Sequence, residues 1–279
     1  MAFAKKSLGL KNWQVSARAK KALGQHFLKS ERALKDIVSA GEIKKGETVL
    51  EIGPGQGALT EKLLEAGARV VAVEKDRALM PVLEEKFAKE IKSGKLELIE
   101  DDILKFEISK SWKQKAGSWK LIANIPYNIT GAIFKKFLSG ENQPEKIVVL
   151  IQKEVAERII ARDKKESVLS LSVKAYGNPK IISHVPRGAF VPAPNVDSAI
   201  LEIDNINRNN FKNKKEEDLF FRIIHAGFKS KRKKLIRNLE SEIKPEILKK
   251  VFEKLSLSEN ARAEDLPLQT WLALARERI

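Results

Sequence analysis

The feature that most constrains the fold is a series of short apolar runs, rich in β-branched residues, between residues 48 and 151. Stretches with helical spacing of apolar residues separate most of these runs. They are Thr48–Ile52, Arg69–Glu74, Leu96–Glu100, Trp119–Ala123 and Ile147–Ile151. Strands that alternate with helices form a mostly parallel sheet with helices on both faces. The sequence therefore predicts an α/β fold with a doubly wound, Rossmann-like sheet.

Two later apolar runs, Lys180–His184 and Ala199–Ile203, are separated by the Pro-rich stretch Pro186–Pro194. Proline fixes its own backbone angle and cannot donate a backbone hydrogen bond, so a rigid loop and not a helix joins the two runs. We expect an antiparallel pair of strands that closes the sheet.

The chain changes character after residue 204. The segment Asp204–Asp218 is polar and has no apolar periodicity, whereas helical spacing begins at Leu219 and continues beyond Leu235. This change predicts an α/β domain over residues 1–204, which includes a basic N-terminal segment over residues 1–30, and a small all-α domain over residues 205–279.

Basic residues dominate the charge. Lys and Arg number 53 against 37 Asp and Glu, a net charge of +16. Residues 1–30 hold seven of them and the stretch Lys229–Arg237 holds six, and neither segment contains an acid. Clusters of this kind attract phosphate backbones because binding releases counterions. Nucleic acid is therefore the expected partner.

Other compositional features exclude whole classes of chemistry. The absence of cysteine excludes disulfides, thiolate-bound zinc, iron–sulfur clusters and the covalent thiolate route that methylation of a pyrimidine carbon requires. No apolar run approaches the roughly 18 residues of a membrane span, and charges stand where a signal peptide has its apolar core. We expect a cytoplasmic protein.

A glycine-rich loop follows the first predicted strand. Gly53, Gly55 and Gly57 lead into the amphipathic segment Ala58–Ala66, which indicates a strand, a tight turn and a helix. Glu74 ends the second predicted strand, where a carboxylate can accept hydrogen bonds from both hydroxyls of a ribose. The loop therefore indicates a cofactor that contains adenosine.

Two kinds of cofactor fit this loop. With Ala58 at the last position it satisfies the fingerprint G-x-G-x-x-G/A of nicotinamide and flavin enzymes. S-adenosylmethionine (SAM) is favoured by Glu51, by the G-x-G-x-G form and by the acidic pair Asp101-Asp102 after the third strand. An aspartate there can accept from an adenine amine, and Glu51 can face a cationic methionine amine.

The segment Asn124-Ile125-Pro126-Tyr127, called the NIPY segment below, follows the fourth predicted strand at the carboxyl edge of the sheet. An exocyclic adenine amine is a poor nucleophile because its lone pair is delocalised into the ring. The Asn124 side-chain oxygen and the Ile125 carbonyl can accept the amine hydrogens, Pro126 holds Ile125 extended, and Tyr127 can stack on the purine. A capped proline turn explains the tetrapeptide alone equally well.

Six ordered motifs together resemble the ribosomal RNA adenine dimethyltransferases, which modify two neighbouring adenines near the 3′ end of small-subunit rRNA. The resemblance spans nearly the whole chain. The motifs are Leu23–Leu28 (LGQHFL), Glu51–Gly55 (EIGPG), Asn124–Asn128 (NIPYN), Gln152–Val155 (QKEV), Phe190–Ser198 (FVPAPNVDS) and the predicted basic helix Phe228–Leu239.

The resemblance implies a SAM-dependent enzyme that dimethylates N6 of two adjacent adenines in a loop of 16S rRNA during ribosome biogenesis. It implies a monomer that binds this rRNA within an immature 30S particle, without a metal ion or a membrane. The implied cofactor-binding residues are His26, which replaces the Asn of many relatives, Leu28, Glu51, Gly53, Gly55, Glu74, Asp102 and Asn124.

The resemblance also implies a catalytic set and an RNA-binding set. Phe190 is expected to form a second aromatic wall that faces Tyr127, so that a flipped adenine lies between two rings. The catalytic residues are then Asn124, Ile125, Pro126, Tyr127 and Phe190. The expected phosphate contacts of the basic helix are Lys229, Lys231, Arg232, Lys233, Lys234 and Arg237.

Three other functions remain open at this point. Large-subunit rRNA adenine methyltransferases of the macrolide-resistance type share the glycine loop and a similar N-x-P-[YF] motif, although the motif Phe190–Ser198 and the helical tail favour the small-subunit enzymes. A ribosome-assembly or transcription factor could keep the same fold mainly for binding. A redox enzyme would use the glycine loop for NAD.

Overall fold

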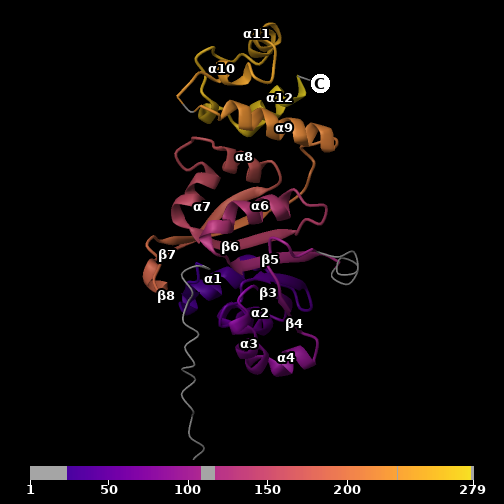
Figure 1. The fold of residues 1–279 in the computed structure, drawn as a ribbon, viewed down its shortest axis with the longest axis vertical. Coiled ribbons are helices and arrows are strands. Elements are labelled where there is room, and N and C mark those ends of the chain that lie inside the picture. Colours follow the sequence, from indigo (N-terminus) through magenta and orange to yellow (C-terminus); the bar gives the residue numbers. More distant parts are fainter. Residues whose placement is uncertain (1–23, 108–116, 231, 278–279) are drawn as a thin grey trace, which may run out of the picture.

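The structure is a computed structural model that describes residues 24–107, 117–230 and 232–277 (Figure 1). Its centre is a seven-stranded sheet with the order β4-β3-β2-β5-β6-β9-β7. The strands from β4 to β6 in this order are parallel, and β9 is antiparallel to both β6 and β7. The strands are β2 (Thr48–Ile52), β3 (Arg69–Glu74), β4 (Leu96–Glu100), β5 (Trp119–Asn124), β6 (Lys146–Gln152), β7 (Asn178–Val185) and β9 (Ser198–Asp204).

This arrangement confirms the predicted Rossmann-like sheet and its closing antiparallel pair. The first three predicted strands have the bounds of β2, β3 and β4, because each is a β-branched run between turn residues. The Pro-rich stretch does not interrupt a central strand. It contains only the short 3₁₀ helix η4 (Arg187–Ala189) and the two-residue strand β8 (Phe190–Val191).

Helices cover both faces of the sheet (Figure 1). One hydrophobic cluster joins a sheet face to α1, α2 and α3, and a second joins the other face to α6, α7 and α8. Consecutive residues of a strand point to opposite faces of the sheet, so Val49 belongs to one cluster and Leu50 to the other. The helices of this part are α1 (Glu31–Gly41), α2 (Ala58–Glu65), α3 (Met80–Lys86), α4 (Ala88–Lys92), α6 (Thr130–Leu138), α7 (Lys153–Ile160) and α8 (Val168–Lys174). Two further 3₁₀ helices are η2 (Arg77–Leu79) and η3 (Tyr127–Ile129).

A second, two-stranded sheet joins distant parts of the chain. Strand β1 (Phe27–Leu28) pairs antiparallel with β8, with Phe27 opposite Val191 and Leu28 opposite Phe190. The backbone amide of Lys29 extends this contact by donating to the Ala189 carbonyl at 2.9 Å. The segment before α1 is therefore attached to the Pro-rich stretch.

The C-terminal part is helical, at the top of Figure 1. It contains α9 (Lys214–Gly227), α10 (Leu235–Leu239), α11 (Pro245–Lys254), the 3₁₀ helix η5 (Ala263–Asp265) and α12 (Leu268–Arg276). A single hydrophobic cluster continues from Leu171 of α8 to Phe220 of α9 and Trp271 of α12. The division into domains at residue 205 stays a prediction.

The predicted polar linker Asp204–Asp218 is wrong at its C-terminal end, because α9 already begins at Lys214. Asn213 caps the helix by accepting a hydrogen bond from the Glu216 amide at 3.0 Å. Glu217 is buried and accepts a hydrogen bond from the Tyr176 hydroxyl, and the Arg276 guanidinium donates to Glu216 at 2.7 Å. Periodicity of apolar residues cannot reveal a first turn that is held by buried polar pairs.

The predicted basic helix Phe228–Leu239 is also wrong, since helical structure resumes only at Leu235. The Asn238 amide donates to the carbonyls of Gly227 at 2.6 Å and Ser230 at 2.9 Å, which holds the connecting segment against α10. Close like charges also disfavour a helix here. Lys231 lies outside the described residues, and exposed side chains are Lys229, Arg232, Lys233, Lys234 and Arg237.

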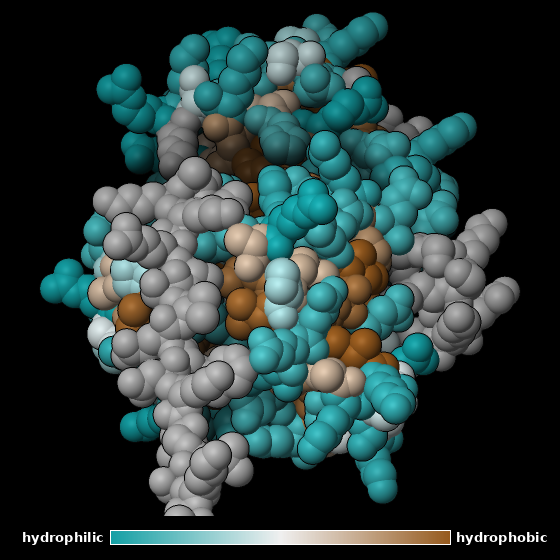
Figure 2. Space-filling view, turned by 60° about the horizontal axis from the view of Figure 1, so that its bottom comes forward, coloured by the Kyte–Doolittle hydropathy of each residue, from teal (hydrophilic) through white to brown (hydrophobic). Residues whose placement is uncertain are grey.

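The surface is largely hydrophilic in the view of Figure 2, with a hydrophobic area near the middle of that face. Among the described residues, no helix combines the length and apolar character that crossing a membrane requires. Of the predicted basic N-terminal segment 1–30, residues 1–23 lie outside the described residues.

Candidate active site

A cavity of about 210 Å³ lies where β2, β3, β4 and β5 end. The chain order reverses here, because β2 has β3 on one side and β5 on the other, and open α/β sheets bind ligands at such a reversal. The cavity brings together eleven predicted residues: His26, Leu28, Glu51, Gly53, Gly55, Glu74, Asp102, Asn124, Ile125, Pro126 and Tyr127. Phe190 and the basic segment are not part of its lining.

The glycine loop has an open side that faces this cavity. Gly53 has a φ of 63°, and a Cβ atom added there would meet nothing within 4 Å. Gly57 has a φ of 78°, and its added Cβ would collide with the Phe87 ring. Gly57 is therefore required for packing, whereas Gly53 leaves room for a ligand to approach the backbone.

Glu51 is a buried acid beside this loop, with 1% of its surface exposed. The Thr60 hydroxyl donates to its Oε2 at 2.7 Å. Burial raises the pKa of Glu51 to about 8, and the nearby Glu74 adds to this shift. A cation placed against the carboxyl group would favour its ionised form, so the position suits an ammonium group.

Glu74 lies at the end of β3 and is 5% exposed. Its two oxygens accept hydrogen bonds from the amides of Gly55 at 3.1 Å and Asp76 at 2.7 Å. Burial raises the pKa of Glu74. Each carboxylate oxygen has a second lone pair, so the group can still accept from two ribose hydroxyls.

Asp102 follows β4, and both of its carboxylate oxygens accept hydrogen bonds within the protein. Lys75 donates to its Oδ2 at 2.9 Å, and the Leu104 amide donates to its Oδ1 at 3.0 Å. The hydrogen bond from Lys75 lowers the pKa of Asp102. Its neighbour Asp101 also lines the cavity, so both acids of the predicted pair lie at the site.

The NIPY segment begins on the last residue of β5. The Asn124 amide group donates to the His26 backbone carbonyl at 3.0 Å, and no group among the described residues donates to its Oδ1 atom. Pro126, with φ −58° and ψ 130°, separates β5 from η3. The Tyr127 hydroxyl lies 2.6 Å from the Ser198 Oγ, and this contact fixes the phenol ring.

The ring opposite Tyr127 is His26. The two ring centroids are 6.0 Å apart with an angle of 20° between the planes, and His26 Nδ1 lies 2.8 Å from the Pro192 carbonyl oxygen. Phe190 is 2% exposed and belongs to the hydrophobic cluster on the α1 side of the sheet. Its predicted role as a second wall stays a prediction.

Three residues of the site were missed by sequence reasoning. Ser198 and Gln25, whose amide donates to Asp76 at 3.0 Å, lie inside motifs that the sequence displays, so their motif positions were a signal. Thr60 supports Glu51 from the neighbouring helix α2. No spacing rule links a strand acid to a hydroxyl of the next helix.

The fold and the site together define a class. An antiparallel β9 inserted between β6 and β7, a glycine loop after β2, an acid at the end of β3 and the NIPY segment at the end of β5 are the features of a SAM-dependent methyltransferase. The buried acid and the open side of Gly53 fit the ammonium group and the close approach of this cofactor.

The chain belongs to the ribosomal RNA adenine dimethylase family, whose model matches residues 16–278. A ribosomal RNA small subunit methyltransferase A from Dehalococcoides mccartyi is 41% identical over 263 residues, which cover 93% of this chain and 88% of that protein. The protein of the same name from Fusobacterium nucleatum is 35% identical over 260 residues, 92% of this chain and 96% of the relative.

Solved structures agree with the fold. A dimethyladenosine transferase from Plasmodium falciparum has a TM-score of 0.75 and 27% identity, and the match covers 89% of this chain and 96% of that one. The 23S rRNA methyltransferase ErmE has a TM-score of 0.71 and 22% identity, and the match covers 90% of this chain and 98% of ErmE. The likeness to ErmE concerns the fold alone.

Proposed function

We propose that this protein transfers methyl groups from SAM to the N6 amines of two adjacent adenines in a loop near the 3′ end of 16S rRNA, during ribosome biogenesis. The observation that carries the proposal is the orientation of Asn124. Its amide group is held by the His26 carbonyl, no described group donates to its oxygen, and Asn124 lines the same cavity as Tyr127.

The cofactor would be held by the residues that line the cavity. Glu51 suits the methionine ammonium group, Gly53 allows close approach of the backbone, Glu74 accepts from the ribose, and Asp102 or Asp101 accepts from the adenine amine. Leu28 and the His26 segment close the cavity from the β1 side. SAM supplies an electrophilic methyl group on a sulfonium centre.

The residues of the NIPY segment would position and polarise the target amine. The Asn124 oxygen and the Ile125 carbonyl accept its two hydrogens, which draws the nitrogen lone pair out of conjugation with the purine ring. Tyr127, fixed by Ser198, supplies a stacking face. A strong base is not required, because an amine that gains positive charge during methylation loses its proton readily afterwards.

The exposed basic segment between α9 and α10 would hold the rRNA backbone. Lys229, Arg232, Lys233 and Lys234 extend from a loop, and Arg237 follows on α10. Contacts of this kind position RNA without reading its sequence. We propose that residues 205–279 form the RNA-binding unit of a cytoplasmic monomer that acts on an immature 30S particle.

The test uses the variant Asn124→Ala and the control Asn178→Ala, whose side chain is exposed at the start of β7. We expect Asn124→Ala to reduce the rate of methyl transfer by about two to three orders of magnitude while RNA binding persists, because an interaction with the developing charge is lost. Control and wild type should behave alike. Mass spectrometry of the rRNA identifies the modified nucleotide.

Two outcomes would contradict the proposal. Retained methyl transfer in Asn124→Ala would place catalysis elsewhere. Methylation of large-subunit rRNA and not small-subunit rRNA, when both are offered as immature particles, would assign the protein to a different substrate.

A further inference from the structure

A second concave surface lies beside the candidate active site, between the start of α7 and the stretch that joins η4 to β9. This groove measures about 450 Å³ and is open on one side. It will be called the α7 groove. Its lining residues are Lys153, Glu154 and Glu157 from α7, Arg187 from η4, and Asn195, Val196 and Asp197 from the joining stretch.

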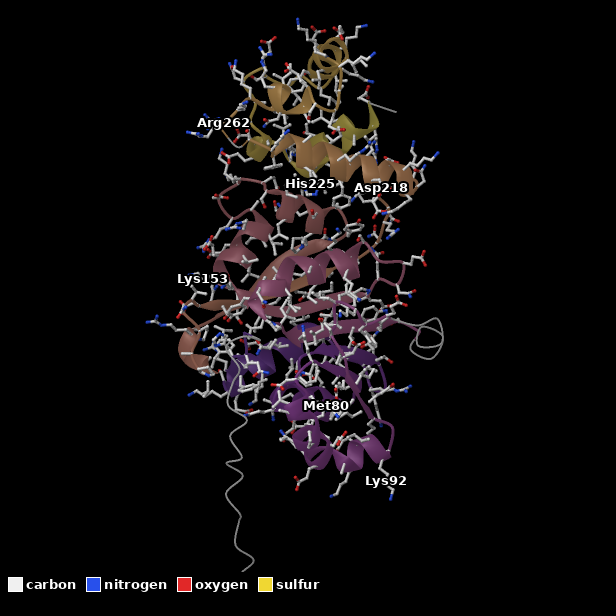
Figure 3. The ribbon with its side chains drawn as sticks, viewed as in Figure 1. Met80, Lys92, Lys153, Asp218, His225 and Arg262 are labelled. Carbon is white, nitrogen blue, oxygen red and sulfur yellow. The ribbon has the colours of Figure 1, made fainter. Side chains whose placement is uncertain are left out.

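The α7 groove is structurally continuous with the site. The Lys153 amide donates to the Asp197 carbonyl at 3.0 Å, and the next residue, Ser198, contacts the Tyr127 hydroxyl at 2.6 Å. Ser198 also pairs with Gln152 across β6 and β9. Asp197, which lines the groove, is therefore the direct chain neighbour of the residue that fixes Tyr127. Figure 3 labels Lys153, at the left edge of the molecule near the Pro-rich stretch.

Each acid that α7 contributes to the groove forms an ion pair with a nearby arginine. Glu154 pairs with Arg158 at 2.5 Å, and Glu157 pairs with Arg162. The Asp197 carboxylate accepts a hydrogen bond from the Arg187 backbone amide at 3.0 Å. The two ion pairs reduce the negative potential that the groove presents to an anion, whereas the hydrogen bond to Asp197 comes from a neutral amide.

Lys153 and Arg187, the two cations of the groove, differ from its α7 acids in this respect. Among the described residues, neither the Lys153 ammonium nor the Arg187 guanidinium has a carboxylate within ion-pair distance. Arg187 is exposed and Lys153 is half-buried. Asn195, also exposed, adds an amide that can bond to a hydroxyl or a phosphate oxygen. The groove thus combines two cations without a described carboxylate partner, a polar amide and the Asp197 carboxylate.

We propose that the α7 groove binds the phosphodiester that flanks the target adenine. The inference rests on the proposed function, because the RNA strand must continue past a base held at Tyr127. A shallow polar groove with two cations suits a sugar–phosphate backbone, whereas a base needs a stacking face. Holding this phosphate fixes which nucleotide of the strand reaches Tyr127. Lys153 and Arg187 are therefore positioning residues.

The test combines a change in the protein with a change in the RNA. The double variant Lys153→Gln/Arg187→Gln removes both cations of the groove. The control Lys89→Gln/Lys92→Gln removes the same charge from α4, and Lys92 is labelled at the lower end of the molecule in Figure 3. The small-subunit rRNA is assembled by ligation, with a neutral methylphosphonate either next to the target adenine or several nucleotides away.

We expect the groove variant to raise KM for RNA about tenfold, as the loss of a charged hydrogen bond does, with an unchanged Kd for SAM. The salt dependence of binding should fall by about 0.7 in log–log slope for each phosphate that the protein no longer neutralises. The methylphosphonate beside the target should also raise KM about tenfold for the wild type and the control. For the groove variant it should change KM less than about twofold.

Two results overturn the assignment while methyl transfer by the wild type persists. One is a groove variant that matches the control. The other is a methylphosphonate penalty that is equal in wild type and groove variant. A wild type that transfers no methyl group to rRNA overturns the proposed function, and the groove assignment with it.

Discussion

Replacing Glu51 by Gln should change how the stability of the protein depends on pH. The wild-type carboxyl is buried, and its pKa in the folded protein is raised to about 8 from an ordinary value of 4.5. Glutamine has the same shape and stays neutral at every pH. Its carbonyl oxygen can still accept the hydrogen bond from Thr60 that Glu51 accepts at 2.7 Å.

The sign and size follow from proton linkage. Between pH 4.5 and about 8 the folded protein holds a proton on Glu51 that the unfolded chain has lost. This contribution to stability is therefore full below pH 4.5 and is lost as the pH rises through 8. One bound proton changes the free energy of unfolding by about 1.4 kcal/mol per pH unit. From about pH 5.5 to pH 7.5, the free energy of unfolding of the variant should therefore rise by roughly 2.7 kcal/mol relative to that of the wild type.

Urea unfolding of the wild type and Glu51→Gln at three pH values in this range measures the difference. Groups that do not interact with Glu51 titrate equally in both proteins, so their contributions cancel. The control Glu61→Gln lies on α2, where Lys86 lowers the pKa of Glu61, so its difference from the wild type should not vary in this range. Parallel stability curves for Glu51→Gln and the wild type would show that Glu51 is ionised when buried and would refute the reasoning.

Two further substitutions test the glycine positions. Gly53→Ala should weaken SAM binding about tenfold or more by calorimetry, because its Cβ enters the space that faces the cavity. The control is Gly94→Ala, because Gly94 has a similar φ of 71° and an added Cβ there also meets nothing within 4 Å. Both variants should lose about 1 kcal/mol of stability, and equal SAM affinity in both would contradict a ligand at Gly53. Gly227→Ala would force a Cβ into the Trp271 ring and should cost about 1–3 kcal/mol in thermal unfolding. Its RNA affinity should fall more than its SAM affinity, and an unchanged Tm would contradict the packing described.

The sequence was most informative where one local pattern decides the structure. The runs that became β2, β3 and β4 combine β-branched residues with flanking turns, so their bounds could be read directly. The glycine loop and the NIPY segment were correctly placed at one edge of the sheet, because both follow parallel strands.

Sequence reasoning failed where distant residues decide the structure. The basic segment has the composition of a helix, but the Asn238 amide binds the carbonyls of Gly227 and Ser230 and holds the segment as a loop. The stacking of His26 on Tyr127 depends on the pairing of β1 with β8, which joins opposite ends of the α/β part. No periodicity within a single segment contains this information.

The pairing of β1 with β8 also bears on how the enzyme would renew its methyl donor. An adenine that receives two methyl groups consumes two donor molecules, so the spent one has to leave between transfers. Each of these strands has only two residues, and separating them breaks few backbone hydrogen bonds while the seven-stranded sheet stays intact. The same movement would pull His26 away from Tyr127. When the two strands separate, either the spent donor is exchanged or the singly methylated base leaves. The ratio of singly to doubly methylated adenine measures which of these two events is faster.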